Sequence, residues 1–204
     1  MVSSTTTFAL IRHGQTDWNA ALRIQGHSDI PLNETGRGQA ADAVGHLADY
    51  EWDFVVSSPL SRAAETADLI ADGLGLTVNR RIPEMVERNY GPAEGMSAGP
   101  ELDALREPGG PTGIGGFIGA EPESTVAARG LTALQLLARD HPGARIIVVS
   151  HGTLIRLTLM QALDQPVDTI RNASLNVLAH TQAGWTLDIL NGIPIPAADL
   201  LPTA

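Results

Sequence analysis

The sequence contains no cysteine and no lysine, and aromatic residues make up only 4% of its 204 residues. The absence of cysteine excludes disulfides, thiolate-held zinc or iron–sulfur sites, and a cysteine nucleophile. All 13 basic residues are arginines, and they are outnumbered by 23 aspartates and glutamates, which gives a net charge of −10 with histidine neutral. This charge disfavours nonspecific binding to nucleic acid or to an anionic membrane, because both attract positively charged surfaces. We expect neither partner, although a local basic pocket is compatible with the composition.

Long apolar segments are also absent. The longest apolar region, residues 146–163, is interrupted by polar side chains that include Ser150 and Arg156, so it is unsuited to span a membrane. The N-terminal residues are rich in serine and threonine, and only a short apolar stretch follows before Arg12, which predicts no secretory signal. With 43% hydrophobic residues and the length of an ordinary domain, the chain predicts a single cytoplasmic domain over residues 1–204.

Three short apolar runs each end abruptly in polar residues. They cover residues 8–11, 54–56 and 146–149, and none of them alternates between apolar and polar side chains. Continuous apolar runs of this length are typical of strands that are buried on both faces of a parallel sheet. Short pieces of buried helix are the alternative interpretation.

Helical patterns lie between these runs. Ser58 is a candidate N-cap residue with Pro59 at the first helical position behind it, because serine caps helices and proline fits their first turn. Near the C-terminus, two strand-like runs flank a short turn and predict an antiparallel hairpin. The expected helices cover residues 38–50, 59–74, 124–139 and 153–163, and the expected hairpin strands cover residues 175–180 and 185–190.

The alternation of strands and helices predicts an α/β fold, a three-layer sandwich whose mostly parallel central sheet carries helices on both faces. Residues 91–123 are rich in glycine and proline and predict an insertion with little regular structure. We interpret this insertion as a small cap or lid over a site. A passive surface loop is the alternative, because long loops are either functional or disordered.

Each of the three apolar runs is followed by residues suited to bind an anion. Arg12 and His13 follow the first run, Arg62 lies shortly after the second, and His151 follows the third. Because ligands of an open α/β sheet sit outside the carboxyl ends of its strands, these side chains should meet at one edge. Two guanidinium groups and two imidazoles would form a basic pocket suited to a phosphate group. Any one of these residues is more often structural, but their conjunction favours a phosphate site.

Longer motifs follow one another along the chain. They are Leu10–Asn19 with the triplet Arg12-His13-Gly14, Arg23–Gly36, Val56–Ala67, Glu87–Gly91 with Glu94-Gly95, and Val149–Gly152. In the identity and order of these motifs, from Leu10 to about Asn176, the sequence resembles the histidine phosphatase superfamily, also called the phosphoglycerate mutase-like proteins. The resemblance implies the α/β sandwich and a two-step phosphoryl transfer through a phosphohistidine, without a metal or a cofactor.

The resemblance implies a role for each residue of the basic cluster. His13 would be the nucleophile, while Arg12, Arg62 and His151 would hold the phosphoryl oxygens and stabilise their charge. Glu87 matches the position of the general acid, a role that typically contributes a rate factor of about 10²–10⁴. For that role its carboxyl group should be protonated before the attack. The residues implied to bind the substrate are Asn19, Gln25, Gly26, Arg88, Tyr90 and Gly152.

The chemistry of the transfer agrees with these roles. Phosphoryl transfer needs mainly positioning and electrostatic stabilisation, and enough fixed cations can take the place of a metal. His13 must be neutral at the attacking nitrogen. Its other ring nitrogen should therefore donate to a fixed acceptor, such as the backbone carbonyl of Gly14.

The resemblance leaves the reaction open between hydrolysis and isomerisation. Arg88 and Tyr90 look like the residues with which cofactor-dependent phosphoglycerate mutases grip a substrate carboxylate. The chain is shorter than those mutases, however, and its insertion offers only Arg106 as an obvious extra cation to retain a bisphosphate intermediate. We therefore favour a phosphatase that acts on a small phosphorylated metabolite, including one whose carboxylate Arg88 could bind.

Two further classes are alternatives. A relative without catalytic activity would bind a phosphorylated ligand, but such proteins typically lack the nucleophile or the acid, and His13 and Glu87 are both present. A metal-dependent hydrolase would need a ligand spacing such as His-Glu-x-x-His, which the sequence lacks. Many members of the family are dimers, so a homodimer is a further expectation.

Overall fold

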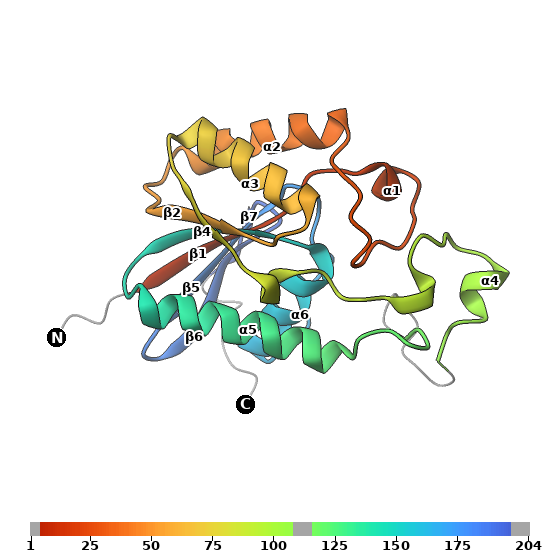
Figure 1. Cartoon of the computed structure of the whole chain (residues 1–204). Helices are drawn as coiled ribbons and strands as arrows, with labels where there is room; N and C mark the ends of the chain where they lie inside the picture. The colour runs from red at the N-terminus through yellow and green to blue at the C-terminus, as the bar shows by residue number, and fades with distance from the viewer. Residues whose placement is uncertain (1–4, 108–115, 197–204) are drawn as a thin grey trace.

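The computed structural model describes residues 5–107 and 116–196, and its centre is a seven-stranded sheet (Figure 1). The strand order is β3-β2-β4-β1-β5-β6-β7. The first four strands in this order are parallel, and the last three are antiparallel to their neighbours. The strands are β1 (Thr6–Arg12), β2 (Phe54–Ser57), β3 (Val78–Arg81), β4 (Arg145–Ser150), β5 (Leu175–Thr181), β6 (Gly184–Leu190) and β7 (Ile193–Pro194).

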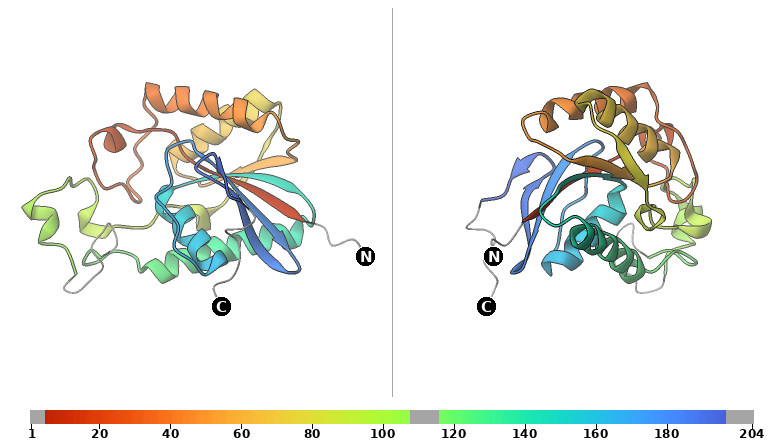
Figure 2. Two further views of the ribbon diagram at one scale, coloured as in Figure 1. Left: turned by 180° about the vertical axis from the view of Figure 1, so that it is seen from behind. Right: turned by 60° about the vertical axis from the view of Figure 1, so that its left-hand side comes forward.

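Helices cover both faces of this sheet. Helices α2 and α3 lie on one face, and α5 and α6 lie on the other (Figures 1 and 2). The α/β three-layer sandwich predicted from the sequence is therefore confirmed. The helices are α1 (Asp17–Ala20), α2 (Glu34–Leu47), α3 (Ser61–Leu74), α4 (Pro100–Asp103), α5 (Glu123–Asp140) and α6 (Gly152–Leu163), with short 3-10 turns η1 (Pro83–Met85) and η2 (Gly91–Ala93).

Strand β1 shows why the core strands have continuous apolar sequences. Phe8 and Leu10 pack with residues of α5 and α6, whereas Ala9 and Ile11 pack with residues of α2 and α3. All four side chains are almost completely buried. Because neither face of β1 meets solvent, both sets of side chains must be apolar, as in other parallel sheets.

Three expected helix boundaries are wrong, and one of them is the end of α2, which lies at Leu47 and not at residue 50. Helix α2 begins at Glu34, four residues before the expected start, because the side chain of Asn33 caps it by accepting from the Gly36 N–H. Helix α3 begins only at Ser61, after Pro59, so Ser58 is not its N-cap. The Ser58 hydroxyl instead contacts the Leu60 N–H and a ring nitrogen of His151. The side chain of Ser58, which was expected to cap the helix, thus contacts His151 in the neighbouring cluster of polar residues.

The structure adds strands β3 and β7, which the sequence analysis did not predict. Strand β3 has the sequence Val-Asn-Arg-Arg, and its last three residues are exposed at the edge of the sheet, so it lacks the apolar signature of the core strands. No helix among the residues that the structure describes is long and apolar enough to cross a bilayer.

The insertion contains more regular structure than expected in its described parts, residues 91–107 and 116–123. These parts form η2, α4 and a bridge between Arg106 and Phe117. They have a small apolar core of their own, made of Tyr90, Ala93, Leu102 and Phe117. Residues 108–115 of the expected irregular insertion lie outside the described residues.

Candidate active site

Four predicted site residues meet at the carboxyl ends of β1 and β4. Arg12 ends β1 and His13 follows it, Arg62 lies in the first turn of α3, and His151 precedes α6. The rings of His13 and His151 are 5.2 Å apart between centroids. The Nε of Arg62 donates a hydrogen bond to Nε2 of His13 over 3.2 Å. Arg62 and His151 are fully buried and His13 is nearly so, so the sequence prediction that these side chains meet is confirmed.

The hydrogen bonds of His13 define which ring nitrogen carries the proton. Its Nδ1 lies 2.6 Å from the carbonyl oxygen of Gly14, which can only accept, so Nδ1 bears the hydrogen and Nε2 keeps its lone pair. Burial, followed by the charges of Arg62 and Arg12, lowers the pKa of His13 well below its ordinary value. The ring is therefore neutral, and its acceptor is the Gly14 carbonyl that the sequence analysis suggested.

Tight backbone contact fixes this acceptor. A Cβ atom on Gly14 would lie 2.3 Å from the carbonyl oxygen of Gly36, and one on Gly36 would lie 2.1 Å from the carbonyl oxygen of Gln15. These distances are too short for any side chain, so glycine is required on both sides of the contact. The start of α2 thus packs directly against the loop that carries His13.

Arg62 is held in place by backbone carbonyls. Its two Nη atoms donate to the carbonyl oxygens of Gly26 and Ser28, at 2.8 and 3.0 Å. Burial lowers the pKa of Arg62 to about 10, a value that leaves it charged at neutral pH. The loop that offers these carbonyls is held in turn by Glu94, whose carboxylate accepts from the backbone N–H groups of His27 and Ser28.

Arg12 and His151 each have one buried nitrogen without a partner among the described residues. Arg12 donates from Nη1 to the carbonyl oxygen of Ile170, while its Nε has no partner. His151 contacts the hydroxyl of Ser58 through Nε2 at 2.8 Å, while its Nδ1 has no partner. Burial, with the charge of Arg62 next, lowers the pKa of His151 well below its ordinary value. Gly152 makes room for this arrangement, since a Cβ there would lie 3.2 Å from Arg12 Nε.

Glu87 is buried beside the N-terminus of α6. Its carboxylate accepts hydrogen bonds from the backbone N–H groups of Arg88, Thr153 and Leu154, at 2.8 to 3.0 Å. All three partners are donors, and a helix N-terminus favours negative charge. The structure thus surrounds the Glu87 carboxylate with three backbone donors at the start of α6.

Asn19 and Gln25 join the same cluster. Asn19 donates from Nδ2 to Oε1 of Gln25, which also accepts from the hydroxyl of Thr16. The Nε2 of Gln25 is buried and has no partner among the described residues. Asn172 bridges to the nucleophile loop, because its Nδ2 lies within hydrogen-bond distance of Asn19 Oδ1 and of the His13 carbonyl oxygen.

Arg88 and Tyr90, which the resemblance implies as substrate-binding residues, are both engaged within the protein. Arg88 donates from Nε to the carbonyl oxygen of Glu121 and from Nη1 to the carboxylate of Glu123. The hydroxyl of Tyr90 lies 2.7 Å from that of Thr153, and burial raises the pKa of Tyr90. Arg88 is thus already paired with the Glu123 carboxylate.

A comparison with known proteins identifies the family. Residues 8–192 match the family model of the histidine phosphatase superfamily (branch 1). The chain belongs to this superfamily. The match covers all the motifs on which the resemblance was based, so the predicted family is confirmed.

Similar proteins of this superfamily are named as phosphatases. The uncharacterized phosphatase PhoE of Bacillus subtilis (strain 168) is 33% identical over 190 residues, which cover 91% of this chain and 94% of PhoE. A metal-independent phosphoserine phosphatase of Arabidopsis thaliana is 35% identical over 202 residues, which cover 91% of this chain and 81% of that protein. The native structure of a mycobacterial glucosyl-3-phosphoglycerate phosphatase matches with a TM-score of 0.76 and 28% identity, over 93% of this chain and 99% of that one. These relatives support the predicted enzyme class, a histidine phosphatase.

Two residues that support the cluster were not predicted from the sequence. Glu94 appeared there only within the Glu94-Gly95 motif, yet it holds the loop that orients Arg62. Arg129 was not considered, although it lies three residues after Val126 and four before Ala133, which are both buried. An arginine on the buried face of a helix needs acceptors, and this was the signal that could have identified it.

A separate groove of about 810 Å³ lies between the β3–η1 segment and α5. Arg80, Pro83 and Leu136 are among the residues that line it, whereas the residues of the basic cluster do not. The groove is therefore distinct from the place where the predicted site residues converge. The described part of the chain contains no group of three or more histidine, aspartate or glutamate side chains placed to hold a metal ion.

Proposed function

We propose that this histidine phosphatase hydrolyses a small phosphomonoester through a phosphohistidine formed at His13, without a metal ion. The observation that carries the proposal is the state of His13, a neutral ring whose Nε2 lone pair points at the guanidinium of Arg62. A nucleophile surrounded by fixed cations suits phosphoryl transfer, in which positioning and charge stabilisation provide most of the catalysis.

In the first step, Nε2 of His13 attacks phosphorus, an N–P bond forms and the bond to the leaving oxygen breaks. Arg62 turns its donors from His13 to the phosphoryl oxygens as the group enters. The unpartnered Arg12 Nε and His151 Nδ1 are further donors for these oxygens. For His151 this requires the hydrogen on Nδ1, and the Ser58 hydroxyl then donates to Nε2.

Glu87 donates a proton in the first step and accepts one in the second. The negative phosphoryl group beside its carboxylate favours the protonated form, because two like charges repel at close range. Glu87 gives this proton to the leaving alkoxide in the first step. In the second step it takes a proton from water, which attacks phosphorus, breaks the N–P bond and releases phosphate.

The substrate we propose carries a carboxylate as well as the phosphate. Phosphoserine and glucosyl-3-phosphoglycerate, which two relatives are named for, share this feature. Arg88 and Arg156 both approach the Glu123 carboxylate, at 3.1 and 3.9 Å. A substrate carboxylate would replace Glu123 between these two arginines.

Three sequence-based expectations belong to the same proposal. They are that residues 91–123 act as a cap over the site of a single domain, that the enzyme works in the cytoplasm, and that it forms a homodimer. Light scattering on the purified chain measures its mass in solution and so tests the dimer.

Phosphate release from a panel of phosphomonoesters, measured in EDTA with wild type and His13→Ala, tests the function. A coupled assay for conversion of 3- to 2-phosphoglycerate, with 2,3-bisphosphoglycerate added, runs beside it. Release that depends on His13, with an acid-labile phosphoryl group trapped on the wild type, supports the phosphatase. Rapid isomerisation with little release would make the protein a mutase, and tight binding without turnover in either assay would make it a binding protein. Loss of activity in EDTA would contradict the metal-free mechanism.

A further inference from the structure

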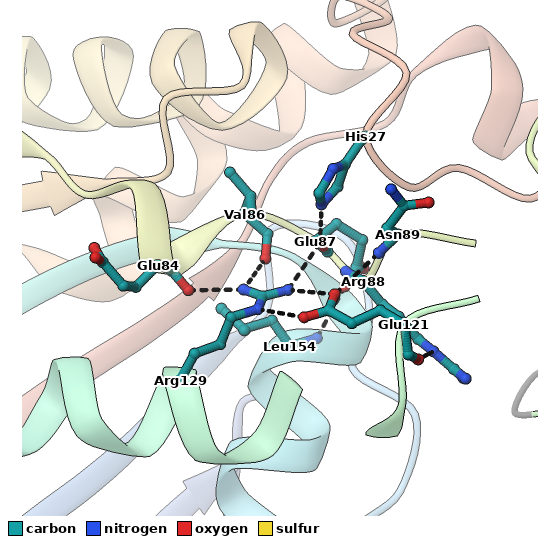
Figure 3. A network of polar contacts seen from close by, with 9 residues as sticks. All are labelled: His27, Glu84, Val86, Glu87, Arg88, Asn89, Glu121, Arg129 and Leu154. Carbon is teal, nitrogen blue, oxygen red and sulfur yellow. Dashed lines mark hydrogen bonds and ion pairs between the residues drawn. The ribbon is translucent and has the colours of Figure 1, made fainter. Parts of the chain in front are cut away.

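We propose that Arg129, together with Glu121, is a positioning residue for Glu87. Arg129 lies on α5 and reaches the carbonyl oxygens of the segment that carries Glu87, while the Glu87 carboxylate accepts from the Leu154 N–H in α6 (Figure 3). This inference rests on the proposed role of Glu87 as the general acid and base.

The guanidinium of Arg129 uses all five of its N–H donors inside the protein (Figure 3). Nη1 donates to the carbonyl oxygens of Glu84 and Val86, at 2.7 and 2.6 Å. Nη2 donates to the carbonyl oxygen of Glu87 at 2.9 Å and to Oε2 of Glu121 at 3.1 Å. Nε donates to Oε1 of Glu121 at 2.9 Å. With no donor left over, Arg129 is built to hold the chain and not to bind substrate.

Arg129 holds a segment that has little other regular support. Glu84 lies in the short 3-10 turn η1, whereas Val86 and Glu87 follow it outside any strand or helix. On another side, Nε2 of His27 lies 2.9 Å from the same Glu87 carbonyl oxygen. The backbone of Glu87 is thus held by α5 and by the His27 loop, and its carboxylate by the first turn of α6. The position of the carboxylate relative to the leaving oxygen depends on both attachments.

Glu121 links this arrangement to the insertion. Its backbone N–H donates to the carbonyl oxygen of Asn89 at 2.8 Å, and its Oε2 accepts from the Asn89 N–H at 3.2 Å. Its own carbonyl oxygen accepts from Arg88 Nε at 2.7 Å. Glu121, at the end of the insertion, forms the ion pair with Arg129. Because Glu121 also bonds to Arg88 and Asn89, the two residues that follow Glu87 are linked to this ion pair.

Loss of a purely structural ion pair and loss of a positioning pair should have different effects on the rates of hydrolysis. Loss of a structural pair lowers stability and reduces the amount of active enzyme equally for every substrate. Loss of a positioning pair displaces the acid, so it slows hydrolysis most where the leaving group needs a proton. An alkyl phosphate has such a leaving group, whereas p-nitrophenyl phosphate leaves readily without one.

The experiment measures kcat and KM of folded Arg129→Met on both substrates. The control is Arg139→Met, a change on the same helix at an exposed arginine that pairs only with Asp140 among the described residues. We expect Arg129→Met to lower kcat on the alkyl phosphate about tenfold or more, a part of the factor that a general acid supplies. The loss on p-nitrophenyl phosphate should be much smaller, KM should stay close to wild type, and Arg139→Met should behave like wild type.

A double variant shows whether the effect passes through Glu87. If it does, Arg129→Met combined with Glu87→Gln hydrolyses the alkyl phosphate no more slowly than Glu87→Gln alone. If Arg129→Met does not fold, Arg129→Lys provides the same test, because a lysine keeps the positive charge but its single ammonium group cannot reproduce the contacts of the guanidinium with three carbonyl oxygens and Glu121.

Equal losses in kcat/KM on both substrates, or no loss, overturn the positioning role while Glu87→Gln still shows its leaving-group dependence. The ratio kcat/KM is decisive because it reports the step in which the leaving group departs, whereas the later attack of water is the same for both substrates. A Glu87→Gln variant without that dependence removes Glu87 as the acid and this inference with it. If wild type releases no more phosphate than His13→Ala, the proposed function itself is wrong. The phosphate-release assay thus separates this outcome from a failure of the positioning role.

Discussion

Arg62 donates a hydrogen bond from Nε to Nε2 of His13, so a permanent cation sits on the lone pair of the proposed nucleophile. The contact is possible only because Nδ1 of His13 already gives its hydrogen to the Gly14 carbonyl. It places the positive charge where the phosphoryl group must arrive. The same guanidinium can therefore keep His13 neutral before the reaction and stabilise phosphoryl oxygens during it.

Replacement of Arg62 by methionine should lower kcat/KM for any phosphomonoester. Loss of one donor to a charged transition state typically costs about 10²–10³ in rate, and Arg62 offers more than one donor. Steady-state kinetics in EDTA measure the effect. Arg37→Met is the matched control, because Arg37 forms a partly exposed ion pair with Glu65 in the same helical layer. A loss of less than about tenfold would show that Arg62 is not part of the phosphoryl site.

His13 should stay neutral as the pH falls through 6.5. Its pKa is lowered by burial and by Arg62 and Arg12, so its protonation occurs below the ordinary value of 6.5. Ring ¹⁵N chemical shifts followed from pH 8 to pH 5 measure this, and His13→Asn identifies the signal. A titration midpoint at or above 6.5 would contradict the buried neutral nucleophile.

The stability of the free enzyme should fall as the pH is lowered below 6.5. The folded-state pKa values of His13 and His151 are both lowered, so between those values and 6.5 the unfolded chain binds more protons than the folded one. In that window each histidine reduces the free energy of unfolding by up to about 1.4 kcal/mol per pH unit, and above 6.5 neither has an effect. Urea unfolding at several pH values measures the slope.

The double variant His13→Asn, His151→Asn isolates this contribution. Its free energy of unfolding should depend less steeply on pH below 6.5 than that of wild type, whatever its stability at neutral pH. His46→Asn, at an exposed position in α2, is the surface control. An unchanged slope in the double variant would mean that the two buried histidines are not the source of the acid sensitivity.

Glu87→Gln should slow hydrolysis of alkyl phosphates more than that of p-nitrophenyl phosphate. The glutamine keeps the size of the side chain but cannot supply a carboxyl proton, and a general acid is typically worth about 10²–10⁴. Its amide nitrogen is a donor, so it cannot accept from the backbone N–H groups in place of the carboxylate oxygen that it replaces. Rates on a series of leaving groups measure the effect, and parallel losses across the series would argue against Glu87 as the acid.

Gly36→Ala and Gly38→Ala, two changes on the same helix, should have opposite effects. A Cβ at Gly36 would strike the backbone of Gln15 beside the His13 loop, whereas one at Gly38 meets nothing within 4 Å. We expect Gly36→Ala to destabilise the fold by about 1–3 kcal/mol and to reduce activity. Gly38→Ala should stabilise it by about 0.5–1 kcal/mol, because alanine is the better helix former. Thermal unfolding with activity assays compares the two, and equal effects would mean that α2 can move away from the loop.

The sequence carried enough information for the core strands and for the basic cluster. Buried parallel strands have a distinct composition, and functional residues directly follow them, so the fold and the meeting of Arg12, His13, Arg62 and His151 could be predicted together. Strand β3 escaped because an edge strand with polar residues carries no such signal. The start of α3 was misplaced because Ser58, a good capping residue, is used by His151 instead.

The supporting residues were harder to predict for a different reason. Glu94 and Arg129 bind backbone groups that lie far from them in sequence, for example 42 to 45 residues away for the carbonyls that Arg129 holds. A backbone carbonyl looks the same in every residue, so neither periodicity nor spacing indicates which arginine it meets. Only the folded chain shows that these contacts converge on Arg62 and Glu87.

Because the two ends of the insertion are bonded to each other, the segment between them can be replaced by a different loop. Asn89 and Glu121 bond to each other through both backbone and side chain, so the chain between them leaves and returns at one fixed point beside Glu87. A segment closed at its base in this way can gain, lose or replace residues at its far end while the base and the acid keep their places. If Tyr90 and Glu94 are kept, because Tyr90 contacts Thr153 and Glu94 holds the loop that orients Arg62, we expect loops taken from other histidine phosphatases to change substrate selection without changing the phosphoryl chemistry.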